Sequence, residues 1–306
     1  MLDLAVIVLN WNNWQLTIQC VNSIKRNRIS NIKIIVVDNG STDDSFSQLK
    51  LVSGVDLVGN KRNYGFAEGN NLAVEYAISC YNPKYFLLLN NDAELKEDAL
   101  IKLYYNREKA GILSPKIYYE DRKTLWACGG KIDLWRSLAW NDREGKIDKN
   151  QYENIRRIKF ASGCALWISR EVIETIGLFD EKYFCYYEDV DLSMRAINKG
   201  ISILFIPEAV VYHKSGATSG GNTKAKYRSS FSDLLSLRNR ILFANKYIRN
   251  RLCSVYFSLL ISVILRIIRK QNRRAYMILR LMWIGLKGNN RIVDNYPVQK
   301  IQYFKD

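Results

Sequence analysis

Several features of exported and disulfide-stabilised proteins are missing from this sequence. Its six cysteines are scattered, and none belongs to a C-x-x-C pair. Isolated cysteines within apolar segments predict buried thiols in a reducing compartment rather than a disulfide framework. The first residues carry neither the basic region nor the small-residue cleavage site of a signal peptide. The sequence therefore predicts a cytoplasmic protein.

Internal repeats and low-complexity linkers are also missing, and the composition is not that of a disordered chain. Of the 306 residues, 48% are hydrophobic, enough for one large core and a smaller appended unit. The composition changes near residues 214–224, which are rich in Ser, Gly and Thr. We therefore expect a main domain over residues 1–222 and a basic helical region over residues 223–306.

Acidic residues are scarce toward the end of the chain. Residues 224–306 contain 18 Lys and Arg against 3 Asp and Glu, and so carry almost all of the formal net charge of +16. Such a region attracts nucleic acids or anionic membranes, and net charge alone does not separate the two. Leu252–Leu265 is 14 uncharged residues, shorter than the roughly 20 that cross a bilayer. Together with Tyr276–Leu286 it suits a helix pair on a membrane surface, or a helical subdomain or oligomer contact.

The first half of the chain alternates apolar strands with helical segments, which predicts an α/β fold with a mostly parallel central sheet. Strands are expected at Leu4–Leu9, Ile32–Val37, Val55–Val58 and Tyr85–Leu89, with helices near 14–27 and 69–80. Further along, we expect a strand at Phe160–Ile168, helices from Arg170 and over Glu188–Lys199, and closing strands at Ile201–Ile206 and Ala209–Tyr212. Polar residues follow three of these strands, at the edge where open α/β sheets bind ligands.

Two polar segments at this edge are candidates for ligand binding. Asp38 ends the second strand and can accept hydrogen bonds from a ligand's hydroxyl or ring N–H groups, whereas Ser41 and Asp43 are expected mainly to cap the next helix. Asn63–Asn71 is a glycine-containing loop that opens a helix and can bring backbone N–H groups to an anion. A turn that needs positive φ would select the same glycines.

Carboxylates mark three further candidates. In Asn90-Asn91-Asp92, after the fourth strand, the acid can hold Mg²⁺ or Mn²⁺ against a diphosphate, or it can belong to a polar turn. Glu188, Asp189 and Asp191 begin a helix and raise one another's pKa, as a general base near neutral pH requires; a solvated acidic helix start is the alternative. His213, the single histidine, ends the last strand as a metal ligand or a structural residue.

Together these motifs resemble glycosyltransferase family 2, and most closely its bacterial rhamnosyltransferase-like branch. The resemblance covers about residues 3–220 and rests on these segments: Val8–Asn12, Val37–Ser41, Asn63–Ala67, Gly69–Asn71, Leu89–Asp92, Ser162-Gly163, Gly177–Glu181, Tyr187–Leu192 and His213. It implies a GT-A (Rossmann-like) fold and metal-dependent, inverting hexosyl transfer from a nucleotide-sugar, such as dTDP-rhamnose. The implied acceptor is a glycan or lipid-linked glycan in the synthesis of O-antigen or other surface polysaccharide.

The resemblance also implies roles for single residues. The implied nucleotide-binding residues are Asn10, Asp38, Asn63, Gly65, Asn90 and Asn91. Asp92 and His213 would bind Mg²⁺ or Mn²⁺, and Asp189 would deprotonate the acceptor hydroxyl. Glu188 and Asp191 would orient the acceptor or their neighbours. Asn90 replaces the first acid of the family's D-x-D motif, which leaves its own contact with the metal open.

Two other classes of protein compete with this interpretation. A nucleic-acid-binding protein would use the basic tail but would leave the carboxylate-rich strand ends unexplained. A catalytically silent nucleotide- or glycan-binding relative would not need Asp92, Asp189 and His213. We therefore expect the protein to bind no nucleic acid. The expected partners are a nucleotide-sugar, a glycan acceptor and the anionic inner face of the cell membrane, to which the protein would bind peripherally. A second copy of the chain, bound through the C-terminal helices, is the remaining candidate partner.

Overall fold

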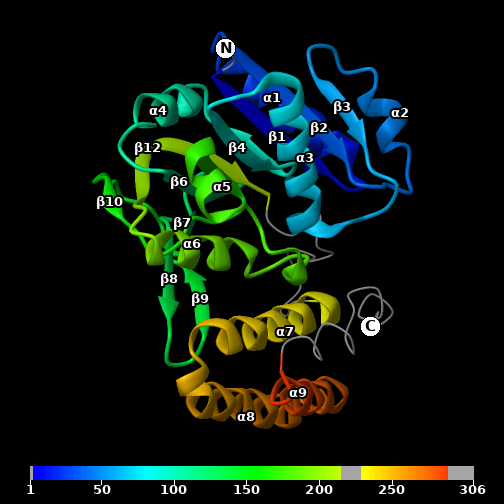
Figure 1. Cartoon of the computed structure of the whole chain (residues 1–306), viewed down its shortest axis with the longest axis vertical. Coiled ribbons are helices and arrows are strands. Elements are labelled where there is room, and N and C mark those ends of the chain that lie inside the picture. The colour runs from blue at the N-terminus through cyan, green and yellow to red at the C-terminus, as the bar shows by residue number, and fades with distance from the viewer. Residues whose placement is uncertain (1–2, 215–228, 289–306) are drawn as a thin grey trace. The chain divides into compact units, whose positions relative to one another are not determined.

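The computed structural model describes residues 3–214 and 229–288, which form two compact units (Figure 1). Unit 1 comprises Met1–Lys131, Trp140–Glu181 and Glu188–Thr218, and unit 2 comprises Ile132–Ala139, Lys182–Tyr187 and Ser219–Asp306. The expected boundary at residues 222 and 223 lies outside the described residues. Unit 2 thus combines the C-terminal helices with two internal segments, Ile132–Ala139 and Lys182–Tyr187. The composition of the sequence did not indicate that these segments belong to it.

The sheet of unit 1 has the strand order β10-β12-β6-β11-β4-β1-β2-β3. Its first half is parallel and consists of β1 (Leu4–Asn10), β2 (Ile32–Asp38), β3 (Asp56–Gly59) and β4 (Tyr85–Asn90). In the register of these strands, Asn10 pairs with Asp38, and Leu9 pairs with Asn90. The polar residues at the strand ends are therefore neighbours, as the sequence predicted.

The second half of the sheet mixes strand directions. It is built from β6 (Ile112–Tyr119), β10 (Arg156–Arg157), β11 (Ala165–Ser169) and β12 (Ile203–His213), with β5 (Ala93–Leu95) and β7 (Leu125–Ala127) at its margins. β11 runs antiparallel to both β4 and β6, whereas β12 runs parallel to β6.

Two strand predictions in this half were wrong in detail. The two expected closing strands are one strand, β12, whose register shifts between Ile206 and Val210. Pro207 lies in this shift and has no N–H for the ladder, so the strand bulges instead of ending. The strand expected at Phe160–Ile168 begins only at Ala165, because Ser162-Gly163 forms a turn whose Ser162 carbonyl accepts the Ala165 N–H.

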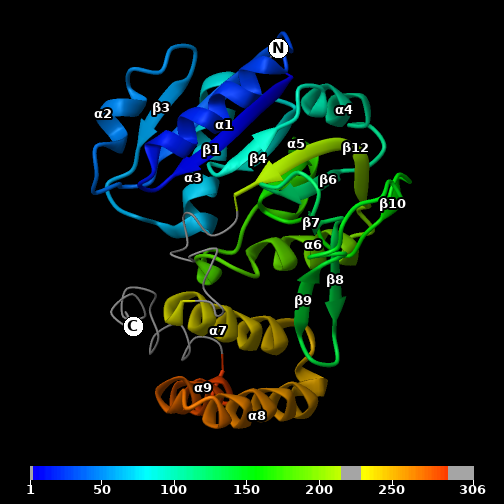
Figure 2. The same ribbon diagram turned by 180° about the vertical axis from the view of Figure 1, so that it is seen from behind.

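Helices cover both faces of the sheet of unit 1 (Figures 1 and 2). One face of β1, with Leu4, Val6 and Val8, packs against α1 (Trp14–Arg26) and α4 (Ala99–Tyr105). The other face, with Ala5 and Ile7, packs against α3 (Gly65–Tyr81), α5 (Arg170–Ile176) and α6 (Glu188–Asn198). The short α2 (Ser45–Leu49) follows β2. Burial on both faces explains the continuous apolar runs of the central strands.

The described residues of unit 2 form three α-helices, α7 (Ser230–Tyr247), α8 (Leu252–Ile268) and α9 (Asn272–Gly285). A short 3₁₀ turn, η2 (Arg249–Arg251), precedes α8. The short 3₁₀ helix η1 (Glu181–Tyr183) leads into the second internal segment. Both α8 and α9 fall where the apolar and basic pattern predicted helical segments. Among the described residues, Arg249–Ile268 has a length and a mean hydropathy, 1.9, that would suffice to cross a membrane, and only 17% of it is buried.

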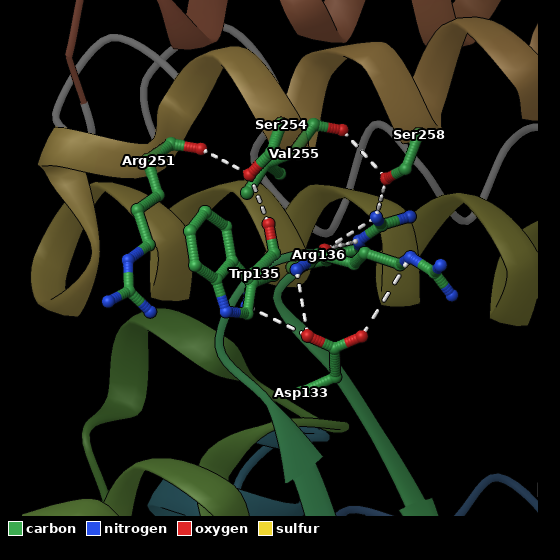
Figure 3. Close-up of polar contacts among 8 residues, drawn as sticks. Asp133, Trp135, Arg136, Arg251, Ser254, Val255 and Ser258 are labelled. Atoms are coloured by element: carbon green, nitrogen blue, oxygen red, sulfur yellow. Dashed lines mark hydrogen bonds and ion pairs between the residues drawn. The ribbon is translucent and has the colours of Figure 1, made fainter.

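The tip of the hairpin formed by β8 (Gly130–Asp133) and β9 (Leu138–Asn141) belongs to unit 2 (Figure 3). Asp133 accepts the N–H groups of Trp135 and Arg136, which closes the turn. The carbonyl oxygen of Trp135 accepts a hydrogen bond from Ser254, and that of Arg136 accepts two from the buried Arg240. Buried polar groups of α7 and α8 thus select this turn as their partner.

The second internal segment of unit 2 is held in the same way. Asn239 of α7 is fully buried and directs its amide nitrogen at the carbonyl oxygens of Tyr183, Cys185 and Tyr186, at 2.7–2.8 Å. Tyr186 and Tyr187 both have φ of +71°, a left-handed conformation that costs a non-glycine residue about 1–2 kcal/mol. The bonds from Asn239 offset this strain immediately before α6 begins.

The thiols are all free, as predicted, but they are not all buried. Cys20, Cys128 and Cys164 are buried, whereas Cys80 and Cys253 are exposed. The two exposed thiols lie on helices, at positions where the apolar pattern of the sequence does not distinguish inside from outside.

Candidate active site

Asp38 and Asn10 form a buried pair at the ends of β2 and β1. The Asn10 amide donates to Asp38 Oδ1 at 2.8 Å and to Ser41 Oγ at 3.1 Å. Ser41 in turn donates its hydroxyl to Asp38 Oδ1 and its N–H to Asp38 Oδ2. Asp38 is only 4% exposed, so these bonds fix the direction of its carboxylate.

The predicted helix-capping role of Ser41 was wrong. Ser41 makes no contact with α2 and instead accepts the backbone N–H of Asn12 at 2.8 Å while it donates to Asp38. Asp43 accepts the N–H of Ser45, the first residue of α2, at 3.0 Å. Ser41 was misassigned because a hydroxyl after a strand suits a helix cap and a loop contact equally well.

Asn39 organises the loop before α3, and sequence reasoning gave it no role. Its amide nitrogen donates to Asn63 Oδ1 at 3.1 Å and to the Gly65 carbonyl at 2.9 Å. Its amide oxygen accepts from Asn60 and from the Tyr64 N–H. Asn63 also accepts the N–H of Gly65, whose φ is +80°. The side-chain oxygen of Asn63 thus shapes the loop, and the only sequence signal for this was the Asn next to Asp38.

Asn91 and Thr17 link the fourth strand end to the first. Asn91 is buried and donates to Thr17 Oγ1 at 3.1 Å, and Thr17 donates to Asn10 Oδ1 at 2.7 Å. Sequence reasoning missed Thr17, which looked like an ordinary residue of α1. Asn90, by contrast, is half-exposed at the end of β4.

Asp92 and His213 meet at the end of β12. The Asp92 Oδ1 atom lies 3.1 Å from His213 Nε2, and both side chains are buried. Burial alone would lower the pKa of His213, but the neighbouring Cys164 sulfur and the Asp92 carboxylate raise it to about 10. Burial also raises the pKa of the Cys164 thiol, and a cation bound by His213 would displace the proton from Nε2.

The donor set of Asp92 and His213 fits a divalent cation. Two atoms bound to one cation in adjacent positions lie about 3 Å apart, because each is about 2.1 Å from the metal, and the observed separation is 3.1 Å. His213 Nδ1 is buried and without a hydrogen-bond partner. Within residues 3–214 and 229–288 no group of three or more His, Cys, Asp and Glu is placed so that it could hold a metal ion. Further ligands would then come from phosphate and water, as is usual for Mg²⁺.

Asp189 begins α6 and is held by two backbone groups. Its Oδ2 accepts the Gly163 N–H at 3.0 Å, and its Oδ1 accepts the Val190 N–H at 2.8 Å. Burial raises the pKa of Asp189 above that of an ordinary aspartate, and the two N–H groups oppose this rise. Asp189 therefore takes up a proton more readily than an exposed aspartate does, and its carboxylate oxygens have lone pairs that can accept one.

Among the acids at the start of α6 that form no ion pair, Glu188 is the most buried. It is 5% exposed, and its Oε2 atom has no hydrogen-bond partner. Burial, and then the charges of Asp189 and Asp191, raise the pKa of Glu188 well above its ordinary value. Glu188 therefore holds a proton more tightly than an exposed glutamate and can act as a hydrogen-bond donor.

Asp191 forms a structural ion pair with Arg195. It is fully buried and accepts a hydrogen bond from Arg195 Nε at 2.8 Å. The guanidinium of Arg195 also donates to the carbonyl oxygens of Ile176, Gly177 and Leu178. Asp191 thus orients a neighbour, which was one of the two roles that the sequence left open for it.

Gly163 and Cys164 bring these groups together. The Cys164 thiol is enclosed, and the charges of His213, Asp92 and Asp189 act on it. The backbone carbonyl oxygen of Cys164 accepts the Asn90 N–H at 2.9 Å. A Cβ atom on Gly163 would lie 3.0 Å from the Phe66 ring and 3.7 Å from Glu188 Oε1. The end of β4, the loop before α3, the start of α6 and the end of β12 therefore converge on the turn before β11.

The comparisons with known proteins agree with this architecture. The family model described as glycosyl transferase family 2 matches residues 5–177, more than half of the chain. The chain belongs to glycosyltransferase family 2.

Three curated relatives are glycosyltransferases. The low-salt glycan biosynthesis hexosyltransferase Agl10 of Haloferax volcanii is 26% identical over 250 residues, which are 79% of this chain and 76% of the relative. The dTDP-rhamnosyl transferase RfbF of Shigella flexneri is 24% identical over 62% of each chain. The N-acetylglucosaminyl-diphospho-decaprenol L-rhamnosyltransferase of Mycobacterium tuberculosis is 25% identical over 62% of this chain and 68% of the relative.

Solved structures show the same fold at lower identity. GalNAc-T7, crystallised with UDP, GalNAc and Mn²⁺, has a TM-score of 0.60 and 18% identity over 80% of this chain, which spans about half (48%) of the GalNAc-T7 chain. The mannosyltransferase PcManGT of Pyrobaculum calidifontis, with GDP-Man and Mn²⁺, has a TM-score of 0.56 and 14% identity over 92% of this chain and 86% of that one. The predicted GT-A fold is confirmed, and the nucleic-acid-binding alternative is not supported.

Proposed function

We propose that this protein transfers a hexosyl group, with inversion, from a nucleoside diphosphate sugar to a hydroxyl of a glycan acceptor. The observation that carries the proposal is the arrangement of Asp92, His213 and Asp189 around Cys164. In this arrangement Asp189 can take a proton, while Asp92 and His213 lie where a diphosphate can be held. Membership of glycosyltransferase family 2 supports the reaction class.

In this proposal Asp38 binds the nucleoside. Its carboxylate is already directed by Asn10 and Ser41, and its remaining lone pairs can accept from a ribose hydroxyl or a ring N–H. Asn10 and Asn91 then act by holding Asp38 and the strand ends in register. Asn63 and Gly65 shape the loop whose backbone N–H groups approach the diphosphate.

Asp92 and His213 are the residues that would hold a divalent cation, Mg²⁺ or Mn²⁺. Such a cation stabilises negative charge on the leaving diphosphate oxygen. The Mn²⁺ in the structures of GalNAc-T7 and PcManGT, which have the same fold, supports this part of the proposal.

Asp189 is the proposed general base. It accepts the proton of the acceptor hydroxyl while the acceptor oxygen bonds to the anomeric carbon and the bond from that carbon to the diphosphate oxygen breaks. Attack on the face opposite the leaving group inverts the anomeric centre. Glu188, whose pKa is raised by burial and by Asp189, would when protonated donate a hydrogen bond to an acceptor oxygen and so orient it.

Rhamnose is the proposed donor sugar, and a lipid-linked glycan is the proposed acceptor. Similarity to the dTDP-rhamnosyl transferase of Shigella and to the N-acetylglucosaminyl-diphospho-decaprenol L-rhamnosyltransferase of Mycobacterium supports these two choices. A lipid-linked acceptor and a cytoplasmic nucleotide-sugar meet at the inner face of the cell membrane, where we place the protein.

The test is a panel of nucleotide-sugars assayed for nucleoside diphosphate release with Mg²⁺ or Mn²⁺. The Asp189→Asn variant should lose about 10²–10⁴-fold in kcat, because the amide cannot accept the proton, and should still bind the donor. Asp44→Asn, which alters an exposed acid at the start of α2, is the matched control and should react like the parent. An unchanged kcat for Asp189→Asn would refute the assignment of the base.

A further inference from the structure

The outward side of α8 is apolar along its whole length. Its exposed residues recur at intervals of three and four, as on one face of a helix, and each is 43–70% exposed: Phe257, Leu260, Ile261, Ile264, Leu265 and Ile268. A surface helix of a water-soluble unit normally presents its polar side to solvent. A contiguous apolar face of this kind marks a contact with a partner or a membrane.

The outward side of α9 has the composition of a membrane interface. Tyr276 and Trp283 are each 63% exposed, and Leu279 and Leu286 are 44% and 63% exposed on the same helix. The basic residues Arg273, Arg280 and Lys287 are exposed among them. Aromatic rings and long basic side chains combine an apolar stem with a polar end, which suits the boundary between headgroups and acyl chains.

The charge around these faces has one sign. Residues 234–293 contain no Asp or Glu. Arg249, Arg269 and Lys270 lie exposed at the two ends of α8. A continuous layer of anionic phospholipid headgroups complements this excess of positive charge better than a second protein of ordinary mixed charge does.

The inward side of α8 is committed to unit 2, which argues against a helix that crosses the bilayer. Val255, Leu259 and Val263 are buried, and Ser258 accepts a hydrogen bond from Arg240 of α7. Arg266 of α8 forms an ion pair with Asp233 of α7 at 2.6 Å. A crossing helix would have to break these contacts or carry the charges into hydrocarbon, both of which are costly. The helical stretch Arg249–Ile268 is long enough to cross, but its uncharged part, Leu252–Leu265, has only 14 residues, so a crossing would place Arg266 in or near the hydrocarbon.

We propose that the exposed faces of α8 and α9 bind an anionic phospholipid bilayer. The α8 face, defined by the six residues from Phe257 to Ile268 given above, enters the boundary between headgroups and acyl chains. The basic residues at its ends and on α9 contact the headgroups. The protein is then attached to one leaflet as a monotopic protein, parallel to the membrane surface.

The experiment is co-sedimentation of the full chain with phosphatidylcholine vesicles that contain or lack phosphatidylglycerol. The parent should sediment with the anionic vesicles, and less so with neutral vesicles or at high salt. The double variant Ile261→Ser with Ile264→Ser should weaken the partition about 100-fold, since two apolar side chains no longer enter the interface. Lys270→Gln should weaken it about fivefold. Leu51→Ser, at an apolar residue of unit 1 that is 78% exposed, is the matched control and should bind like the parent.

A second readout reports on the face itself. Cys253 is exposed one turn before Phe257 on α8, whereas Cys80 is exposed on α3. A polarity-sensitive dye on Cys253, in a Cys80→Ser background, should shift to shorter wavelength when anionic vesicles are added. The same dye on Cys80, in a Cys253→Ser background, should not.

Three outcomes would overturn the proposal. Equal binding of the double variant and the parent would show that the α8 face does not enter the membrane. A parent that is dimeric without vesicles, and monomeric after Ile261→Ser with Ile264→Ser, would assign the face to a second copy of the chain. Resistance of the membrane-bound protein to alkaline carbonate extraction would show that the helix crosses the bilayer. Unchanged thermal unfolding of the double variant verifies that the substitutions act on the surface alone.

Discussion

The Asp189 carboxylate accepts a hydrogen bond from the backbone N–H of Gly163 at 3.0 Å. This bond ties the first turn of α6 to the turn before β11, two segments that are 26 residues apart. It fixes the direction of the carboxylate and stabilises its ionised form inside a buried environment, where burial alone would favour the neutral acid. A base can thus be enclosed with its substrate and still be ready to take a proton.

The pH dependence of activity should reveal this balance. Because the pKa of Asp189 is raised, kcat/KM should fall with decreasing pH already above the ordinary aspartate pKa of about 3.9. The fall should follow a single protonation on the acid side, measured in the free enzyme as kcat/KM against pH. Far-UV circular dichroism over the same range separates protonation from unfolding. A rate that stays constant until the fold is lost would contradict the assignment.

Glu188 should make stability depend on pH in the opposite direction from a salt-bridged acid. Its raised pKa means that the folded state binds the proton more tightly, so stability falls as pH rises through the window above the ordinary glutamate value. The Glu188→Gln variant lacks this loss and should be more stable than the parent at pH 8, on the order of 1 kcal/mol, and no more stable at pH 4. Urea unfolding at both pH values measures the difference.

The ion pair of Asp191 with Arg195 should be worth far more than a surface pair of the same spacing. Arg195→Met leaves a fully buried carboxylate and three carbonyl groups without their donor, and should destabilise the fold by about 3–5 kcal/mol. Arg170→Met breaks the exposed pair with Glu174, also spaced i,i+4, and should cost about 0.5 kcal/mol or less. Equal losses in urea unfolding would show that burial of Asp191 is not what matters.

Gly40 should tolerate no side chain. Its φ is +67°, and a Cβ atom would lie 2.3 Å from the backbone of Arg62, in the segment that leads to the loop before α3. Gly40→Ala should cost about 2–5 kcal/mol, from strain and overpacking together. Gly145 has a φ of +77° but nothing within 4 Å, so Gly145→Ala should cost only about 1–2 kcal/mol. Thermal unfolding of the two variants measures both losses of stability, and the difference between them is the contribution of overpacking.

Metal binding should depend on both Asp92 and His213. Calorimetric titration with Mn²⁺ in the presence of a nucleoside diphosphate should show binding by the parent and a loss of about tenfold or more for Asp92→Asn or His213→Gln. Glu94→Gln alters a partly exposed acid two residues away and should bind as the parent does. Parent-like titration of both site variants would place the cation elsewhere.

The sequence predicts where the strands end because burial of the strands determines both their apolar composition and the position of the polar site residues after them. A run that is buried on both faces must be continuously apolar, so the first polar residue after it marks the edge of the sheet, as at Asp38 and at Asn90, two residues before Asp92. The parallel register then places Asn10 opposite Asp38 without further information. This part of the site follows from local pattern alone.

Other parts of the site depend on contacts that no local pattern encodes. Thr17 and Asn39 matter because of partners that lie up to 74 residues away in the sequence, and a threonine or asparagine suits many helix and loop positions equally well. β12 continues past Pro207 because β6 lies beside it and accepts a shifted register. Such choices are made by tertiary packing, which overrides the local signal.

The make-up of unit 2 also bears on the order in which the chain can mature. Ile132–Ala139 and Lys182–Tyr187 leave the ribosome well before Arg240 and Asn239, whose side chains bind their carbonyl groups. Until α7 is synthesised, the segment just before α6 lacks the hydrogen bonds from Asn239 to its carbonyl groups, although the Tyr187 hydroxyl can already donate to Ser137. A gene shortened after unit 1 would therefore yield a protein with a frayed approach to Glu188 and Asp189, even though the sheet itself is encoded in full.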